Sequence, residues 1–264
     1  MKMVSAAKLK KAQDAITAMR PYSSKLTELL QNLSATLDGD AGGAYSTSRE
    51  VSKVLLVVVT SNRGLCGGFN SSITKRVVQT VAEKYADKTV ELLTIGKKGK
   101  ATLGKTFKVK DSKDAIFDDL TFDNVALIAE ELMELYADGT YDKIEIVYNQ
   151  FKNAATQIPQ VEQFLPIKPI ESGADITNSD YIFEPSKEEI VLALIPKSLK
   201  TQLYKSIRDS FASEHGARMT AMHKATDNAK DLRDDLLLTY NKARQAAITN
   251  EILEIVGGAE ALKN

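Results

Sequence analysis

The clearest pattern in the chain is a stripe of apolar positions near its start. The stripe advances in alternating steps of three and four residues, at Leu9, Ala12, Ile16, Met19, Ser23, Leu26, Leu30, Leu33 and Leu37. This spacing keeps the stripe on one side of a helix, as in a coiled coil. Pro21 lies within the run and should kink the helix, because it removes one backbone hydrogen bond. The glycine and aspartate residues at 38–43 predict that the helix ends there.

The middle of the chain alternates between strand-like and helix-like segments. A continuous apolar run such as Val54–Val59 is typical of a strand that is buried on both faces. The hydropathy pattern predicts strands at 54–60, 90–95 and 144–148, a weaker strand at 161–167, and helices at 71–85 and 122–136, with a lysine and glycine stretch at 96–110. This order predicts a mostly parallel sheet with helices on its faces.

The last segment predicts one very long helix. Residues 197–256 contain no proline and a single glycine, Gly216. A helix of that span would be about 90 Å long, whereas a compact chain of this length has a diameter near 47 Å. We therefore expect an α/β fold in which a Rossmann-like, mostly parallel sheet domain (46–185) is inserted between two long terminal helices (1–45 and 186–264) that form an antiparallel coiled coil.

The apolar seam of the second helix is weaker than that of the first. Polar and small residues interrupt it. The seam runs through Phe211, His215, Arg218, Met222, Ala225, Ala229, Leu232, Leu236, Thr239, Ala243, Ala246, Asn250 and Leu253. Such a pair is marginal alone, so the pattern implies that something else surrounds it.

Composition narrows the possible functions. Lys plus Arg and Asp plus Glu both number 35 in 264 residues, so the zero net charge excludes a basic nucleic-acid binder. The neutral sum hides a basic start, with six bases and one acid in 1–25, and an acidic stretch, with eleven acids and two lysines in 111–145. No apolar run approaches the roughly 20 residues of a membrane span, and we expect no signal sequence because the start MKMVSAAKLK has no apolar core. We expect no direct membrane insertion, and any membrane contact should go through a partner.

No constellation of residues predicts catalysis. The turn after the first strand carries Gly64, Gly67 and Gly68, but their spacing fits neither the dinucleotide nor the P-loop motif. Cys66 is the single cysteine and has no nearby base in the sequence, so a packing role is favoured. His215 and His223 are eight residues apart, which is too far for a shared metal ion without a third ligand. We expect neither a metal nor a cofactor.

The last helix carries a series of hydrogen-bonding side chains over successive turns. They are Arg218, Arg244, Gln245, Thr249 and Glu251. Spacing alone slightly favours a solvated helix face, but an arginine also suits charged contacts that form and break, because its planar fork binds carboxylates in pairs of hydrogen bonds.

Four stretches of the sequence resemble a known family. They are KMVSAAKL (2–9), TSNRGLCGGFN (60–70), SEHGARMTAM with ATDNA (213–229), and YNKARQAAITNEILEIVGGAEA (240–261). The last contains a C-terminal signature at Ile248, Thr249, Glu251, Glu254, Gly258 and Ala259. The chain resembles, from end to end, the gamma subunits of F-type ATP synthases, which form the central rotor stalk. Their fold is the one expected above, with a Rossmann-like domain that binds no nucleotide.

The resemblance implies a non-catalytic role in ATP synthesis. The coiled coil would turn inside a ring of alternating alpha and beta subunits, driven by proton flow through a membrane-embedded c-ring, and would act by differential binding to open and closed catalytic sites. It implies that Arg218, Arg244, Gln245 and Thr249 face loops of the beta subunits, that Glu251 supports them and that Met1 lies near the same loops. Tyr181 would lie at the foot, near epsilon and the c-ring. The implied location is the cytoplasmic side of the bacterial inner membrane, as a peripheral protein.

Two features depart from the family pattern. Family members carry roughly three further heptads before the position of Met1, so we expect either an internal start or a short first helix. Gly216 stands where the family has a better helix former. A glycine inside a helix costs about 1 kcal/mol of helix stability. Two other functions remain open: a Rossmann-like enzyme that binds a nucleotide at the glycine-rich turn, and a passive coiled-coil scaffold.

Overall fold

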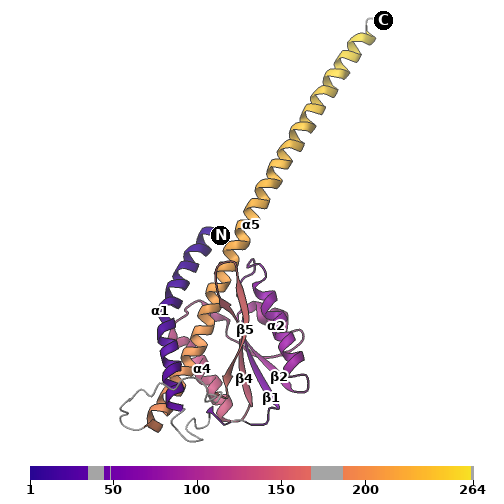
Figure 1. Ribbon diagram of the computed structural model, residues 1–264. Helices are drawn as coiled ribbons and strands as arrows, with labels where there is room; N and C mark the ends of the chain where they lie inside the picture. The colour runs from indigo at the N-terminus through magenta and orange to yellow at the C-terminus, as the bar shows by residue number, and fades with distance from the viewer. Residues whose placement is uncertain (35–44, 48, 168–186, 263–264) are drawn as a thin grey trace. The chain divides into compact units, whose positions relative to one another are not determined.

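A five-stranded sheet forms the centre of the folded domain (Figure 1). The computed structural model describes residues 1–34, 45–47, 49–167 and 187–262. The strands lie in the order β3-β2-β1-β4-β5, and neighbouring strands are parallel except for the antiparallel pair β4 and β5. Their bounds are β1 Lys53–Val59, β2 Thr89–Ile95, β3 Lys108–Ser112, β4 Lys143–Phe151 and β5 Gln157–Leu165. This confirms the expected α/β class with a mostly parallel sheet.

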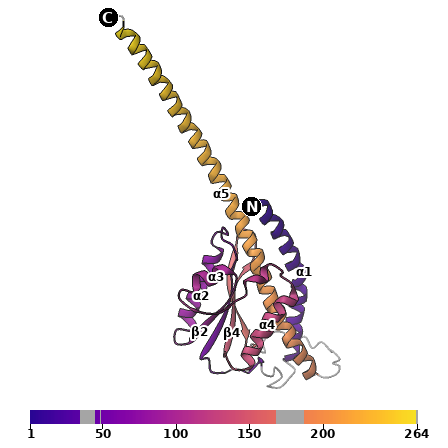
Figure 2. The same cartoon turned by 180° about the vertical axis from the view of Figure 1, so that it is seen from behind.

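Helices cover both faces of the sheet (Figures 1 and 2). On one face α2 (Phe69–Lys84) packs through Ile73 and Val77 against the side chains of β1 that alternate toward it. On the other face lie α4 (Phe122–Ala137) and the first part of α5 (Lys187–Ala261), and their apolar side chains join one continuous core with β1 and β4. Because β1 is covered on both faces, Val54–Val59 are all fully buried, which explains the unbroken apolar run.

The long helix extends beyond the proline-free segment at 197–256. α5 includes Pro196 and starts at Lys187. The lysine and glycine stretch at 96–110 contains two elements that its hydropathy did not predict, α3 (Lys97–Leu103) and β3. β3 is an edge strand with one apolar residue, Val109, so it carries no clear period-two signal.

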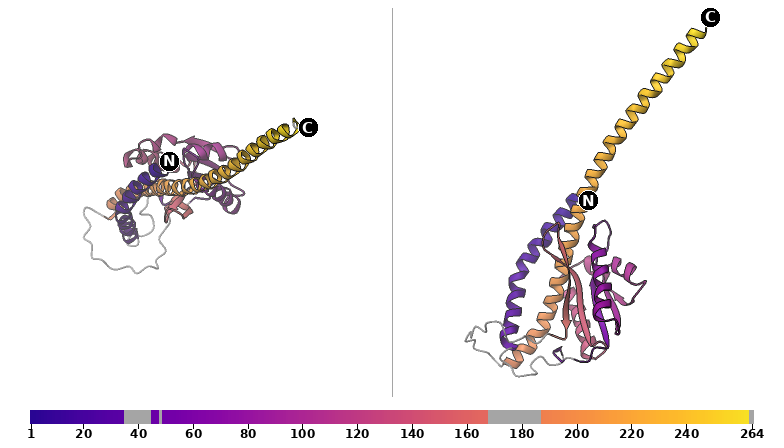
Figure 3. Two further views of the ribbon diagram at one scale, coloured as in Figure 1. Left: turned by 90° about the horizontal axis from the view of Figure 1, so that it is seen from above. Right: turned by 45° about the vertical axis from the view of Figure 1, so that its right-hand side comes forward.

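The chain divides into two compact units, Met1–Thr220 and Ala221–Asn264. Within the first unit, α1 (Lys2–Ser34) lies beside the first part of α5 and runs antiparallel to it (Figures 1 and 3). Leu9, Ala12 and Ile16 of the predicted stripe are buried there against Phe151 and Ala212. α1 continues through Pro21, and the predicted end of this helix at 38–43 lies outside the described residues.

Gly216 allows α5 to approach the loop that joins β4 to β5. A Cβ atom at this position would lie 3.1 Å from the Cα atom and 3.2 Å from the carbonyl oxygen of Ala154. That loop is fixed by the Asn153 carboxamide, whose oxygen accepts hydrogen bonds from the amides of Ala155 and Thr156 at 3.0 and 2.7 Å. The glycine therefore has a packing role, which explains why helix propensity does not decide the residue here.

We expect Gly216→Val to lower the free energy of unfolding by about 2 kcal/mol, because it overpacks a contact between backbones. Urea denaturation of the full chain measures the change. Gly257→Val is the matched control on the same helix, because a Cβ atom there meets nothing within 4 Å among the described residues. Equal losses in both variants would contradict a packing role for Gly216.

Candidate functional site

The turn between β1 and α2 uses its own polar groups to hold its shape. Ser61 donates its hydroxyl proton to the carbonyl oxygen of Arg63 at 2.6 Å, and the Asn70 amide donates to the Ser61 hydroxyl oxygen at 2.8 Å and to the Cys66 sulfur at 3.2 Å. Cys66 is buried inside this network. Leu65 has a φ of 62° and an exposed side chain, a conformation that is strained for a branched residue.

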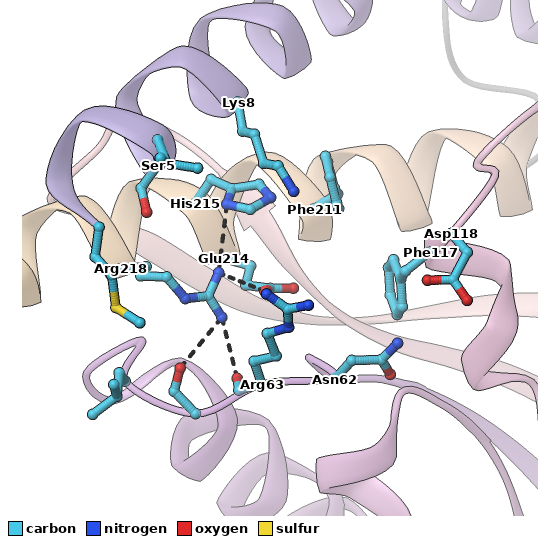
Figure 4. Close-up of a pocket in the computed structure, with 14 residues that line it drawn as sticks. Ser5, Lys8, Asn62, Arg63, Phe117, Asp118, Phe211, Glu214, His215 and Arg218 are labelled. Carbon is cyan, nitrogen blue, oxygen red and sulfur yellow. Dashed lines mark hydrogen bonds and ion pairs between the residues drawn. The ribbon is translucent and has the colours of Figure 1, made fainter.

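A cavity of about 350 Å³ lies beside this turn, in the first unit. We call it the polar cavity. Residues from four elements line it: α1, the glycine-rich turn, the 3-10 helix η2 (Asp114–Phe117) with the residue after it, and α5. The charged and aromatic residues of its lining are Lys8, Arg63, Phe117, Asp118, Phe211, Glu214, His215 and Arg218 (Figure 4).

Arg218 fixes α5 to the glycine-rich turn. Its Nη1 atom lies 2.6 Å from Oε1 of Glu214, one helical turn earlier, and its Nη2 atom donates to the carbonyl oxygens of Arg63 at 3.1 Å and Gly64 at 3.4 Å (Figure 4). Arg218 is 8% exposed. The guanidinium therefore joins two segments more than 150 residues apart in the sequence, and its hydrogen bonds are made within the chain.

A second polar contact anchors the same part of α5. The Ser213 hydroxyl donates to the carbonyl oxygen of Asn149 in β4 at 3.0 Å, while the Asn149 amide donates to the carbonyl oxygen of Phe69 at the start of α2. These buried bonds connect α5, the sheet and α2 at the carboxyl end of the central strands.

Burial sets the protonation of the two ionisable neighbours of Arg218. Desolvation raises the pKa of Glu214, although Arg218, Lys8 and Arg63 all oppose this change. Desolvation, with the positive charges of Arg218 and Lys8, lowers the pKa of His215 to about 4. His215 is therefore neutral at pH 7. Its Nδ1 atom lies 3.4 Å from Nη1 of Arg218, and an arginine can only donate.

The second unit presents the other polar residues that the sequence singled out. Arg244, Gln245, Thr249 and Glu251 are all exposed on α5. The Thr249 hydroxyl donates to the carbonyl oxygen of Gln245 in its own helix at 2.9 Å. Large apolar side chains on this part of α5 are exposed as well, at Leu232, Leu236, Leu237, Leu238, Tyr240, Ile248, Ile252, Leu253, Ile255 and Val256.

Two candidate contact residues remain, Met1 and Tyr181. Met1 is exposed and lines the mouth of the polar cavity, whereas Tyr181 lies outside the described residues. Among the described residues, no group of three potential ligands could hold a metal ion. Within the same ranges, no helix is both long enough and apolar enough to span a bilayer.

Sequence reasoning missed the charged residues of the polar cavity other than Arg218, which are Lys8, Arg63, Asp118 and Glu214. The four-residue spacing of Glu214 and Arg218 is a visible signal for an ion pair on one helix face. Nothing in the sequence links either residue to Lys8 or Arg63, because that proximity depends on how α1, the turn and α5 meet.

Comparison with known proteins decides the family. A family model described as ATP synthase matches residues 1–262. The ATP synthase gamma chain of Flavobacterium psychrophilum is 72% identical over 263 residues, which are 100% of this chain and 92% of the relative. The chain belongs to the ATP synthase gamma chain family. The family resemblance, the rotor-subunit role and the non-catalytic role inferred from the sequence are thereby confirmed.

More distant relatives and solved structures give the same family and the same fold for this gamma-chain family member. The gamma chain of Geotalea daltonii is 44% identical over 264 residues, covering all of this chain and 92% of the relative. Among solved structures, the central stalk and c-ring of the Tetrahymena thermophila mitochondrial ATP synthase matches with a TM-score of 0.62 at 25% identity, over 86% of this chain and 97% of that one. A rotor chain from the Euglena gracilis enzyme shares the fold, with a TM-score of 0.58 at 18% identity over 94% and 98% of the two chains.

Proposed function

We propose that this gamma-chain family member couples rotation of a c-ring to conformational change in catalytic beta subunits, through the part of α5 that follows Thr220. The observation that carries the proposal is the exposed apolar and polar surface of that segment. Exposed apolar patches of this extent mark sites of protein association, and an arginine on such a surface is a frequent source of binding energy.

The proposed partners are an alpha and beta hexamer around this segment, with epsilon and the c-ring at the foot. Arg244, Gln245 and Thr249 would contact beta-subunit loops, with Glu251 in support, and Met1 would lie near the same loops. Tyr181 is the proposed foot contact. The proposed location is the cytoplasmic face of the bacterial inner membrane, as a peripheral protein.

Arg218 has a different status from the other proposed contacts. Its guanidinium is buried and bonded within the first unit, so a contact with a beta loop would have to form at the edge of the polar cavity or replace an internal bond. A variant at Arg218 would therefore change folding and partner contact together, and Arg244 gives the cleaner test.

We expect the double variant Arg244→Ala with Gln245→Ala to lower proton-driven ATP synthesis by the reconstituted complex about tenfold. Truncating two contact side chains of an interface removes binding energy that corresponds to an effect of about this size. Both side chains are exposed in the chain itself, so urea unfolding of the isolated chain should not change. Lys75→Ala, an exposed substitution on α2, is the control and should synthesise ATP normally. Full synthesis by a correctly assembled double variant would favour a passive scaffold instead.

A further inference from the structure

The polar cavity lies beside the carboxyl end of β1, one of the two strands between which the order of the sheet reverses. The chain passes from β1 to β2 and β3 on one side of the sheet and then crosses to β4 on the other, so the order reverses between β1 and β4. Ligands of such sheets bind outside the carboxyl ends of the strands at this reversal. The polar cavity is lined by residues that directly follow β1, from Asn62 to Leu65.

One residue that lines the cavity, His215, carries a buried donor without an acceptor. Because Arg218 Nη1 can only donate, Nδ1 of His215 accepts, and the proton of the neutral ring is on Nε2. His215 is 6% exposed, and its Nε2 atom has no hydrogen-bond partner among the described residues. A buried N–H group that lacks an acceptor is unfavourable, so this atom indicates a missing acceptor.

Two cationic side chains approach the same space. Lys8 extends from α1 toward the His215 ring, and Arg63 extends from the turn toward Glu214 (Figure 4). Neither forms an ion pair or a side-chain hydrogen bond with any residue in the described ranges. Glu214, one of the two acids in the lining, already pairs with Arg218. The lining holds three cations and two acids, Asp118 and Glu214, which leaves an excess of donors.

We propose that the polar cavity binds a small oxyanion, a phosphate or carboxylate group, held by Lys8, Arg63 and Nε2–H of His215. One oxygen would accept from the imidazole, and the two cations would balance the charge at the cavity mouth. The volume of about 350 Å³ is room for roughly ten water molecules, which accommodates a hydrated phosphate. The site is independent of the proposed role of the segment after Thr220.

Inorganic phosphate is the probe. We expect saturable binding to the full chain by isothermal titration calorimetry, with sodium chloride at matched ionic strength as the reference. Lys8→Gln should weaken binding about tenfold or more, because it removes a charge-assisted hydrogen bond at the mouth. Lys10→Gln removes the same charge from an exposed position of α1 that does not line the cavity, and should bind like the unsubstituted chain.

Nuclear magnetic resonance of the His215 ring provides a second measurement that does not depend on a variant. The Nε2–H proton signal should be present in the free chain and should shift downfield with phosphate over the same concentration range. Equal weakening by Lys8→Gln and Lys10→Gln would show binding to surface charge only and would overturn the proposal. An unchanged ring signal, or no saturable binding up to about 10 mM phosphate, a very weak affinity, would also overturn it.

Discussion

Arg218→Ala is expected to lower the free energy of unfolding of the full chain by about 4 kcal/mol, because removing one partner of a buried ion pair leaves the other charge buried and unpaired. The variant would also leave the carbonyl oxygens of Arg63 and Gly64 without this donor. Urea denaturation measures the loss. Arg218→Lys should recover only part of it, since a single ammonium cannot reproduce the fork that reaches Glu214 and the turn together.

The control for this experiment is Arg233→Ala, which removes an exposed arginine from the same helix. Arg233 pairs with Asp234 at a solvated position, and such pairs contribute about 0 to 1 kcal/mol. Adding Glu214→Gln to Arg218→Ala should restore part of the stability, because it removes the orphaned charge. A loss below about 1 kcal/mol for Arg218→Ala, too small for a buried pair, would show that the guanidinium does not anchor α5.

The second large effect is a loss of stability in mild acid that depends on His215. The pKa of His215 is about 4 in the folded chain and 6.5 without the fold, so between these values the unfolded chain binds the additional proton. This contribution is fully present above pH 6.5 and is lost as the pH falls to 4. The lowered pKa corresponds to about 3 kcal/mol of unfolding free energy.

The difference between the unsubstituted chain and His215→Gln isolates this contribution. Glu214 acts with the opposite sign, because its raised pKa makes its contribution fall as the pH rises above the ordinary value for a glutamate. Arg218 and Lys8 supply positive charges that act on both groups. As the pH falls from 7 to 4, the unsubstituted chain should lose unfolding free energy relative to His215→Gln, and a constant difference would show that the buried ring does not titrate in this range.

Periodicity allowed most of the fold to be predicted from the sequence. The alternating stripe placed Leu9, Ala12 and Ile16 on one side of a helix, where they are buried, and the unbroken apolar run predicted that β1 is covered on both faces. β3 was missed because a mostly polar edge strand such as Lys108–Ser112 has little apolar content. The antiparallel direction of β5 was not predicted either, because strand direction depends on the short loop at 152–156.

The candidate site was less predictable than the fold. The sequence identified Arg218 but could not show that it is buried, because its acceptors at Arg63 and Gly64 are brought to it only by the packing of α5 on the turn. Gly216 was interpreted through helix propensity, and its contact with Ala154 depends on a close approach between segments that are distant in the sequence. Helix propensity and hydrophobic periodicity describe one helix or strand at a time. The roles of Arg218 and Gly216 instead depend on contacts between different elements of the fold.

The exposed segment of α5 after Thr220 has a consequence for the mechanics of the chain. None of its large apolar side chains is buried within the described residues, and an isolated helix derives little stability from propensity alone. Its resistance to bending and to fraying would therefore come from the subunits that we propose to surround it. In this view the torsional stiffness of the shaft is a property of the assembled motor, and it would be acquired only as the surrounding ring closes.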